Sequence, residues 1–319
     1  MQGSGLRLFQ TGPQPIIAQC SLEEAEKTEH TYSVGGITFS VESDLPIAVK
    51  ERFFVEEPPC SVFGERNETL SLRISSCPET YIKREKIFSL QRTDLYTTAE
   101  GYLQEFYSAD DKKELLWTVA INRAFSQFDY ALHSRRSEKA FTIPDPYGPI
   151  FSLFLLQHSV INHQGLIIHA AGGALHGKGI AFAAPSGTGK STLSRLLGQA
   201  SGHQLFSEER LILRSVAEQW HLWGTPWHGQ SDLARNASCP LSALVFLRQS
   251  ETTEISWLRP AAGLRRLLQV VSVPWYSEEW AEKGIALCER LIQDVPIFEL
   301  AFRPDRSTVQ AVKRFAAEV

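Results

Sequence analysis

The chain of 319 residues has little cysteine and only one methionine. Its cysteines are odd in number and widely scattered, and none has the Cys-x-x-Cys spacing of a zinc or redox site. This scarcity argues against a disulfide-rich secreted domain and against a structural zinc module. We expect all five cysteines to be reduced and mostly buried: Cys20, Cys60, Cys77, Cys239 and Cys288.

The sequence also lacks a basic excess and a long apolar run. Lysine and arginine number 32 against 36 acidic residues, and the net charge of −4 provides no general attraction for nucleic acid or anionic lipid. The most apolar segment, residues 149–161, is interrupted by polar side chains and is shorter than the ~20 residues of a membrane helix. The first 20 residues contain no apolar run of signal-peptide length. We therefore expect a cytoplasmic protein without nucleic-acid or membrane partners.

What is present is typical of a folded protein of about two domains, at ~150 residues per domain. Residues 1–30 are polar, and we expect a weakly ordered lead-in there. Short runs rich in β-branched and aromatic residues then predict a β-rich N-terminal domain over residues 31–144. These runs lie at 31–41, around Gly35 and Gly36, and at 61–63, 70–74, 86–90 and 99–107. The proline-rich turn at 144–149 predicts a boundary, with a second domain over residues 145–319.

The second domain begins with a segment that is apolar on all sides, residues 150–161, which predicts a buried helix. Two β-prone runs follow at 166–171 and 180–183, joined by a predicted turn at 176–179. Immediately after them comes a glycine-rich loop. Leu193, Leu196 and Leu197 then recur on one helical face, so the order is strand, loop, helix.

The loop reads Ala-Pro-Ser-Gly-Thr-Gly-Lys-Ser-Thr over residues 184–192. Its glycines allow consecutive N–H groups to converge on one anion at a helix N-terminus, where the helix dipole favours negative charge. A lysine at this place can contact the β- and γ-phosphates, and the serine hydroxyl after it can ligate Mg²⁺. Ala184 replaces the usual first glycine, which is acceptable if its φ is negative. The candidate nucleotide-binding residues are Ser186, Gly187, Thr188, Gly189, Lys190, Ser191 and Thr192.

Three further side chains are candidates for catalysis. Glu208 and Glu209 follow a very short apolar run after the loop helix. Adjacent carboxylates can divide two tasks, because one can bind metal while the other accepts a proton; the alternative is a solvated surface turn. His169 lies on the run before the loop and can reach the phosphates if the strands at 166–171 and 180–183 pair; a buried core histidine is the alternative.

Together these residues resemble the catalytic domain of the HPr kinase/phosphorylase family. The resemblance is carried by Ile-His-Ala-Ala at 168–171, the loop, and Ser-Glu-Glu at 207–209, and more loosely by residues 32–46, 224–227 and 296–300. It implies a mixed α/β fold related to phosphoenolpyruvate carboxykinase, in which ATP and Mg²⁺ are used to phosphorylate a serine hydroxyl. His169 then matches the family histidine, and Glu208 and Glu209 match its Asp-Asp pair.

The departures from the family limit what the resemblance implies. Glutamates replace the aspartates, which lengthens each side chain by one methylene, and the glycine-rich segment used for HPr itself has no counterpart. The sequence therefore predicts an ATP- and Mg²⁺-dependent kinase whose acceptor is a hydroxyl of a peptide, a protein or a small molecule. The expected catalytic residues are His169, Lys190, Glu208 and Glu209. The expected metal ligands are Ser191, Glu208 and Glu209. A catalytically weak ATP-binding switch or accessory module is the alternative, and a carboxykinase-type reaction is a third hypothesis. The oligomeric state stays open, with a homo-oligomer among the options.

Basic side chains offer candidate surfaces for an acidic acceptor, although each of these groups is also typical of a solvated face. They are Arg135, Arg136 and Lys139, then Arg265 and Arg266, and finally Arg303 and Arg306.

Overall fold

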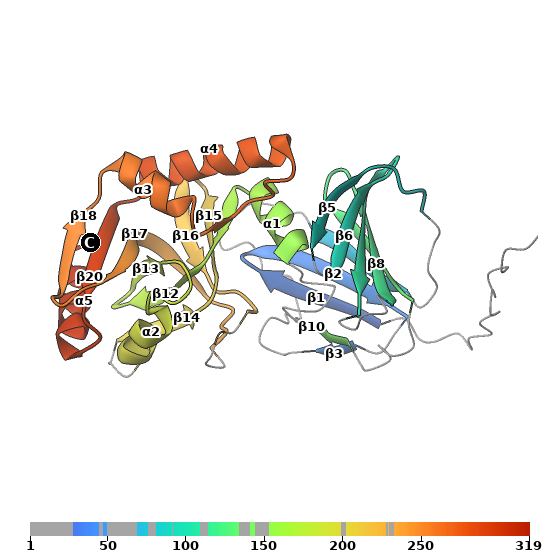
Figure 1. The fold of residues 1–319 in the computed structure, drawn as a ribbon. Coiled ribbons are helices and arrows are strands. Elements are labelled where there is room, and N and C mark those ends of the chain that lie inside the picture. The colour runs from blue at the N-terminus through green and yellow to red at the C-terminus, as the bar shows by residue number, and fades with distance from the viewer. Residues whose placement is uncertain are drawn as a thin grey trace, which may run out of the picture.

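The computed structural model describes residues 28–319 except for 45–46, 50–68, 76–80, 91, 109–113, 134–140, 144–152, 199–201, 228 and 230–232. Over these residues the chain forms two large mixed sheets, one small sheet and five helices (Figure 1). The fold is therefore mixed α/β. The predicted boundary at 144–149 lies outside the described residues.

The first sheet comes from the N-terminal part of the chain and consists mostly of hairpins. Its eight strands follow the order β1 (Thr28–Val34), β2 (Ile37–Ser43), β4 (Thr69–Ser75), β9 (Gln127–Leu132), β8 (Leu115–Asn122), β7 (Gly101–Tyr107), β6 (Thr93–Thr97) and β5 (Lys86–Leu90). A separate two-stranded parallel sheet pairs β3 (Ile47–Val49) with β10 (Phe141–Ile143).

Most strands expected here are confirmed, with one correction. The runs at 31–41, 70–74, 86–90 and 99–107 appear as β1 with β2, β4, β5 and β7, whereas 61–63 lies outside the described residues. Residues 28–30, expected in the lead-in, belong to β1. They are ordered by the β1–β2 ladder, which extends from Val34↔Ile37 to Thr28↔Ser43.

The second sheet contains the strands around the glycine-rich loop. Its main path is β14 (His203–Ser207), β12 (Ala170–Leu175), β13 (Lys178–Ala183), β17 (Ser238–Gln249), β16 (Gln219–Trp223), β15 (Leu211–Val216), β11 (Gly165–Ile168) and β19 (Val271–Ser272). Beside β17 lies β20 (Ile297–Phe302), which also pairs with β18 (Glu254–Trp257).

Three neighbouring strands of this sheet, β13, β17 and β20, run parallel. Their central residues, 180–183, 243–247 and 300–302, are buried and apolar, as is typical of parallel strands covered on both faces. One face packs against α2 (Lys190–Gly198) and α5 (Arg306–Glu318), and the other faces the larger core. Because the strands are parallel, their carboxyl ends meet at one edge, where the loop begins.

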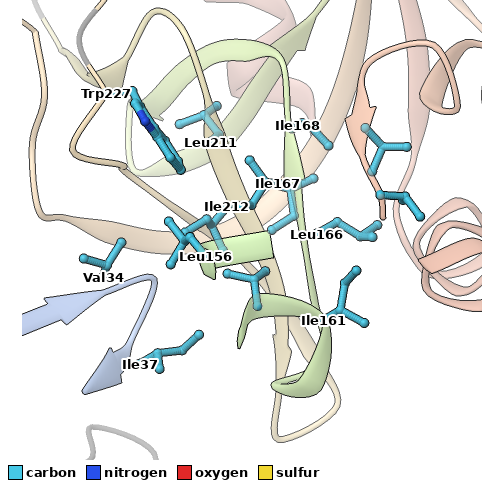
Figure 2. Packing of buried hydrophobic residues seen from close by; sticks show 14 of the residues in the cluster. Val34, Ile37, Leu156, Ile161, Leu166, Ile167, Ile168, Leu211, Ile212 and Trp227 are labelled. Atoms are coloured by element: carbon cyan, nitrogen blue, oxygen red, sulfur yellow. The ribbon is translucent and has the colours of Figure 1, made fainter. Parts of the chain in front are cut away.

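The larger core continues from the second sheet into the first. Near the junction lies α1 (Leu153–Asn162), between the two sheets, and α4 (Glu278–Asp294) extends along one side after α3 (Pro260–Leu267) (Figure 1). Figure 2 shows Val34 and Ile37, on either side of the β1–β2 turn, near Leu156 and Ile212. All four are fully buried in one apolar cluster. The helix predicted at 150–161 is confirmed from Leu153 onward.

The β1–β2 turn is fixed by contacts with the second sheet. Arg214 is 5% exposed, and its guanidinium donates to the carbonyl of Gly35 at 2.5 Å and to that of His163 at 2.9 Å. A Cβ on Gly36 would lie 2.7 Å from a ring carbon of Trp223. The turn therefore closes against its neighbours and leaves no room for a side chain.

Two of the five cysteines lie in described residues, and both are free thiols, as expected. Burial raises the pKa of Cys239 and of Cys288 to about 12, so both stay protonated near pH 7. None of the helices seen in the described part of the chain has the length and apolar character to cross a bilayer.

Candidate active site

The glycine-rich loop connects the end of β13 to the start of α2. Gly187 and Gly189 have φ values of 81° and 106°, which L side chains rarely adopt. Gly187 is exposed, and a Cβ there would meet no atom within 4 Å. The first N–H groups of α2 have no partner within the helix, so the loop presents free donors at an open surface.

The loop is held from beneath by neighbouring strands. The amide of Gln249, at the end of β17, donates to the carbonyl of Gly187 at 3.4 Å. The ring of Phe302, at the end of β20, would lie 2.9 Å from a Cβ on Gly189. Ala184 is not among the non-glycine residues with positive φ, so the departure from the usual glycine creates no strain.

Lys190 is the first residue of α2 and is 6% exposed. Its Nζ donates to the carbonyls of Ala184 at 2.7 Å and Pro185 at 3.0 Å. Burial lowers the pKa of Lys190 to about 8, and the negative charge of Glu209 offsets only part of this effect. An ammonium group held by carbonyl dipoles in this way is stabilised further when a phosphate supplies negative charge.

His169 lies between two strands, which differs from the expectation of one strand over 166–171. Its N–H donates to the carbonyl of Val270 at 2.8 Å, while its own carbonyl accepts from Ala184 at 3.4 Å. The chain thus leaves β11 and enters β12 at this residue. Because β12 then pairs with β13, with Ala170 opposite Ala183, His169 lies beside the first residue of the loop.

The ring of His169 faces one of the two glutamates. Its Nε2 lies 3.5 Å from Oε1 of Glu209. Burial, with the nearby charge of Lys190, lowers the pKa of His169, and the attraction of Glu209 opposes this only in part. The imidazole is therefore neutral near pH 7 and can donate one hydrogen bond without carrying charge.

Glu208 and Glu209 follow β14 in a tight turn. The hydroxyl of Ser207 accepts from the N–H groups of Glu209 at 3.2 Å and Arg210 at 3.3 Å. Glu208 is only 4% exposed. A Cβ on Gly229 would lie 2.9 Å from Oε1 of Glu208, so Gly229 permits this close approach. The sequence reasoning missed Gly229, and its isolated position in Trp-His-Gly-Gln was the only signal.

These predicted residues line one pocket with the loop. The pocket has a volume of about 430 Å³, and its walls include His169, Gly187, Lys190, Ser191, Glu208 and Glu209. The side chains come from separate segments of the second sheet and from α2. We call this the phosphate pocket, after the chemistry of its donors.

The donor set of the phosphate pocket also fits a magnesium ion. Among the described residues, no group of three or more His, Cys, Asp or Glu side chains forms a metal cluster. Mg²⁺ usually takes only one or two carboxylates, together with substrate phosphates and waters. The hydroxyl of Ser191 and a carboxylate of the Glu208–Glu209 pair, all lining one pocket, are such a set.

A second pocket, of about 760 Å³, adjoins the first. Ser191, Thr192 and Glu208 line both pockets. We call it the side pocket; its remaining walls include Arg195 on α2, Leu205 on β14, and Arg235.

The basic groups expected to form an acceptor surface do not line either pocket in the residues described. Arg266 and Arg248 both pair with Glu299, and Arg303 lies 3.5 Å from Asp305. Positions 135, 136 and 139 lie outside the described residues.

Comparison with known proteins gives a family match around the site. The family described as "SynChlorMet cassette protein ScmC" matches residues 150–300, a range that contains the loop and the phosphate pocket. Among solved structures, the Hpr(Ser) kinase/phosphatase from Coxiella burnetii is similar at a TM-score of 0.29 and 12% identity, over 48% of this chain and 88% of that one. A search of curated proteins finds no match.

Proposed function

We propose that the protein is an ATP- and Mg²⁺-dependent kinase that transfers the γ-phosphoryl group to a hydroxyl acceptor. The observation that carries this proposal is the shared lining of the phosphate pocket. An open glycine-rich loop, a buried lysine, a serine at the helix start, two carboxylates and a neutral histidine all border one space. Phosphoryl transfer needs these parts, because its catalysis consists mainly of positioning and charge stabilisation.

In this proposal the loop and Lys190 bind the phosphates of ATP. The N–H groups of residues 187–191 donate to the phosphate oxygens, and the ammonium of Lys190 exchanges its two carbonyl partners for the β- and γ-phosphates. Binding two phosphates raises the lowered pKa of Lys190 again, since negative charge favours the protonated amine.

The two glutamates divide the remaining tasks. Ser191 and Glu209 hold Mg²⁺, and His169 orients Glu209 by donating from Nε2. When bound there, Mg²⁺ neutralises charge on the phosphoryl oxygens. Glu208 is the carboxylate that lines both pockets, so it is the one that can contact a hydroxyl in the side pocket and still border the phosphates.

The transfer step follows from this arrangement. The acceptor oxygen forms a bond to the γ-phosphorus, the bond from that phosphorus to the β,γ-bridging oxygen breaks, and ADP leaves with the electron pair. The hydroxyl proton passes to the carboxylate of Glu208. Lys190 stabilises the charge that develops on the transferred group.

The test is incubation of the full chain with γ-labelled ATP, Mg²⁺ and a panel of seryl peptides and small hydroxy compounds. Mass spectrometry then locates the label. Label on an acceptor supports the kinase. Tightly bound ATP with only slow phosphate release and no labelled acceptor contradicts it and supports the nucleotide-binding switch instead.

A further inference from the structure

The side pocket carries two positive charges that lack a counter-ion in the described part of the molecule. Arg195 lies on the exposed side of α2 and Arg235 on the segment before β17; both side chains are exposed and both line the pocket. Neither forms an ion pair with a described residue, whereas Arg266 and Arg290 elsewhere pair with Glu299 and with Glu218. The two arginines therefore favour an anionic ligand between them.

A buried hydroxyl in the same wall also lacks a partner. Ser194 is 4% exposed, and its Oγ forms no hydrogen bond with the described residues. A serine inside a helix commonly donates to the carbonyl four residues earlier, so this orphan is unusual. Because the Oγ itself is buried, this hydroxyl faces the protein and not the open space of the side pocket, so the polar recognition of a ligand falls to the two arginines.

The remaining walls limit what the ligand can be. Leu205 and Leu233 give the pocket an apolar side, which suits a short carbon chain. At about 760 Å³ the space is in the range of small-molecule sites and of a few peptide residues. Glu208 and Ser191 mark its border with the phosphate pocket, so a ligand held by the arginines presents its near end to the phosphates.

We propose that the side pocket binds the acceptor, and that Arg195 and Arg235 select an acceptor that carries a carboxylate near the hydroxyl to be phosphorylated. This inference rests on the proposed kinase function and specifies its substrate class. The carboxylate can belong to an acidic residue beside a serine in a peptide, or to the acceptor itself in a small hydroxy acid. Glu208, which lines both pockets, faces the hydroxyl.

The test measures binding and transfer separately on the full chain. The probes are a fluorescent seryl peptide flanked by glutamates, the same peptide with glutamines, and L-serine as the small hydroxy acid; a fluorescent ATP analogue reports the phosphate pocket. The variants are Arg195→Glu and Arg235→Glu. The matched control is Arg314→Glu, an exposed arginine on α5 that lines neither pocket.

We expect a carboxylate-bearing probe to bind at least about tenfold more tightly than the glutamine peptide, because hydrogen bonds between arginine and a carboxylate are stronger than those with a neutral amide. Each reversal in the side pocket weakens that probe at least about tenfold and leaves ATP-analogue affinity within about twofold, whereas Arg314→Glu changes neither. Whether the peptide or L-serine is the ligand identifies the source of the carboxylate.

Three results would overturn the inference. One is equal affinity for the charged and glutamine peptides together with no binding of L-serine. Another is an unchanged preference in both side-pocket variants. The third is loss of ATP-analogue affinity in Arg195→Glu, because the pocket would then hold the nucleoside. If the wild-type chain binds no ATP analogue, the proposed kinase function itself fails. The three results above would overturn only the acceptor inference and would leave the kinase proposal standing.

Discussion

Two glycine turns in this molecule share an unusual backbone but differ in their surroundings. Gly35 and Gly36, between β1 and β2, have φ values of 61° and 71°, and Gly187 in the loop before α2 has 81°. A side chain on Gly36 would collide with Trp223, and one on Gly35 would come within 2.8 Å of Ile212. A side chain on Gly187 would meet nothing within 4 Å.

The difference lies in what occupies the space beside each glycine. In the β1–β2 turn, the space that a side chain would need is filled by the second sheet, so glycine allows the two sheets to pack closely. At Gly187 the space is empty, although the backbone there is as constrained. An exposed loop that excludes side chains and is fixed by Gln249 and Phe302 is suited to contact by an external group.

The largest expected effect is on phosphoryl transfer. Lys190→Met removes the cation that, in the proposed function, contacts the phosphates, and we expect transfer from γ-labelled ATP to fall by at least about 10²- to 10³-fold. Far-UV circular dichroism of the variant should match the wild type, which separates lost chemistry from lost folding. A Lys190→Met protein with undiminished transfer would contradict the assignment of the phosphate pocket.

The second prediction concerns the stability contributed by the close packing of Gly36 against Trp223. Gly36→Ala places a methyl group against Trp223 at a φ of 71°, and we expect the free energy of unfolding to fall by about 2–4 kcal/mol. Gly177→Ala is a matched control, because Gly177 has a φ of 82° with nothing within 4 Å, and only the backbone penalty of about 1 kcal/mol applies. If urea denaturation gives the same loss in the free energy of unfolding for both variants, the Trp223 side chain must move away from the added methyl group at little cost.

A third prediction concerns the stability of the ligand-free protein. Burial lowers the pKa of Lys190 from 10.5 to about 8, so the folded state binds the lysine proton less tightly than the unfolded state does. Replacement with Met should raise the free energy of unfolding at pH 7 by about 1–3 kcal/mol. The reason is that each pKa unit by which folding lowers the lysine pKa corresponds to about 1.4 kcal/mol, and methionine removes this cost of burying the charge. The loss of the two hydrogen bonds of Lys190 offsets part of that gain in stability.

The stability difference between the wild type and Lys190→Met should also change with pH, in a direction that burial of the ammonium group determines. Below pH 8 the lysine is charged in both states, and the destabilisation is fully present. As pH rises from 8 to 10.5, the folded state loses the proton first, so the wild type gains stability relative to Lys190→Met. A stability difference that stays constant across this range would show that burial of the ammonium is not its source.

The smallest effect on stability is expected at the two open glycines, Gly177 and Gly187, which should differ in ATP binding and not in stability. Gly187→Ala and Gly177→Ala have nearly the same φ and equally open space, so each should reduce stability by about 1 kcal/mol. Only Gly187→Ala should also weaken ATP binding, since it disturbs the N–H groups that we propose to contact the phosphates. Equal ATP affinity in both variants, measured by fluorescence titration, would argue against contact with the loop.

Local sequence patterns predicted much of this fold. Runs rich in β-branched and aromatic residues around Gly35 and Gly36 predicted β structure there, which the structure shows as β1 and β2. The leucines after the loop predicted a helix, which the structure shows as α2. Such features depend on turn chemistry and helical periodicity within a short window. His169, Glu208 and Glu209 also followed from local pattern, because short strands carry them to the same edge of the sheet.

Features that depend on distant contacts could not be predicted in this way. The break between β11 and β12 at His169 is set by Val270, which lies far along the chain. The contact of Arg214 with Gly35 joins the two sheets, and Arg195 and Arg235 meet at one pocket only because of the fold. Neither of these pocket arginines has a basic neighbour in the sequence that would have marked it as part of a cationic site.

The most direct test of the central claim is a calorimetric titration of ATP with Mg²⁺ into the wild-type chain and into Lys190→Met at pH 7. We expect saturable binding of one ATP by the wild type and affinity at least about tenfold weaker in the variant. Absence of ATP binding by the wild type, or equal affinity in both proteins, would contradict it.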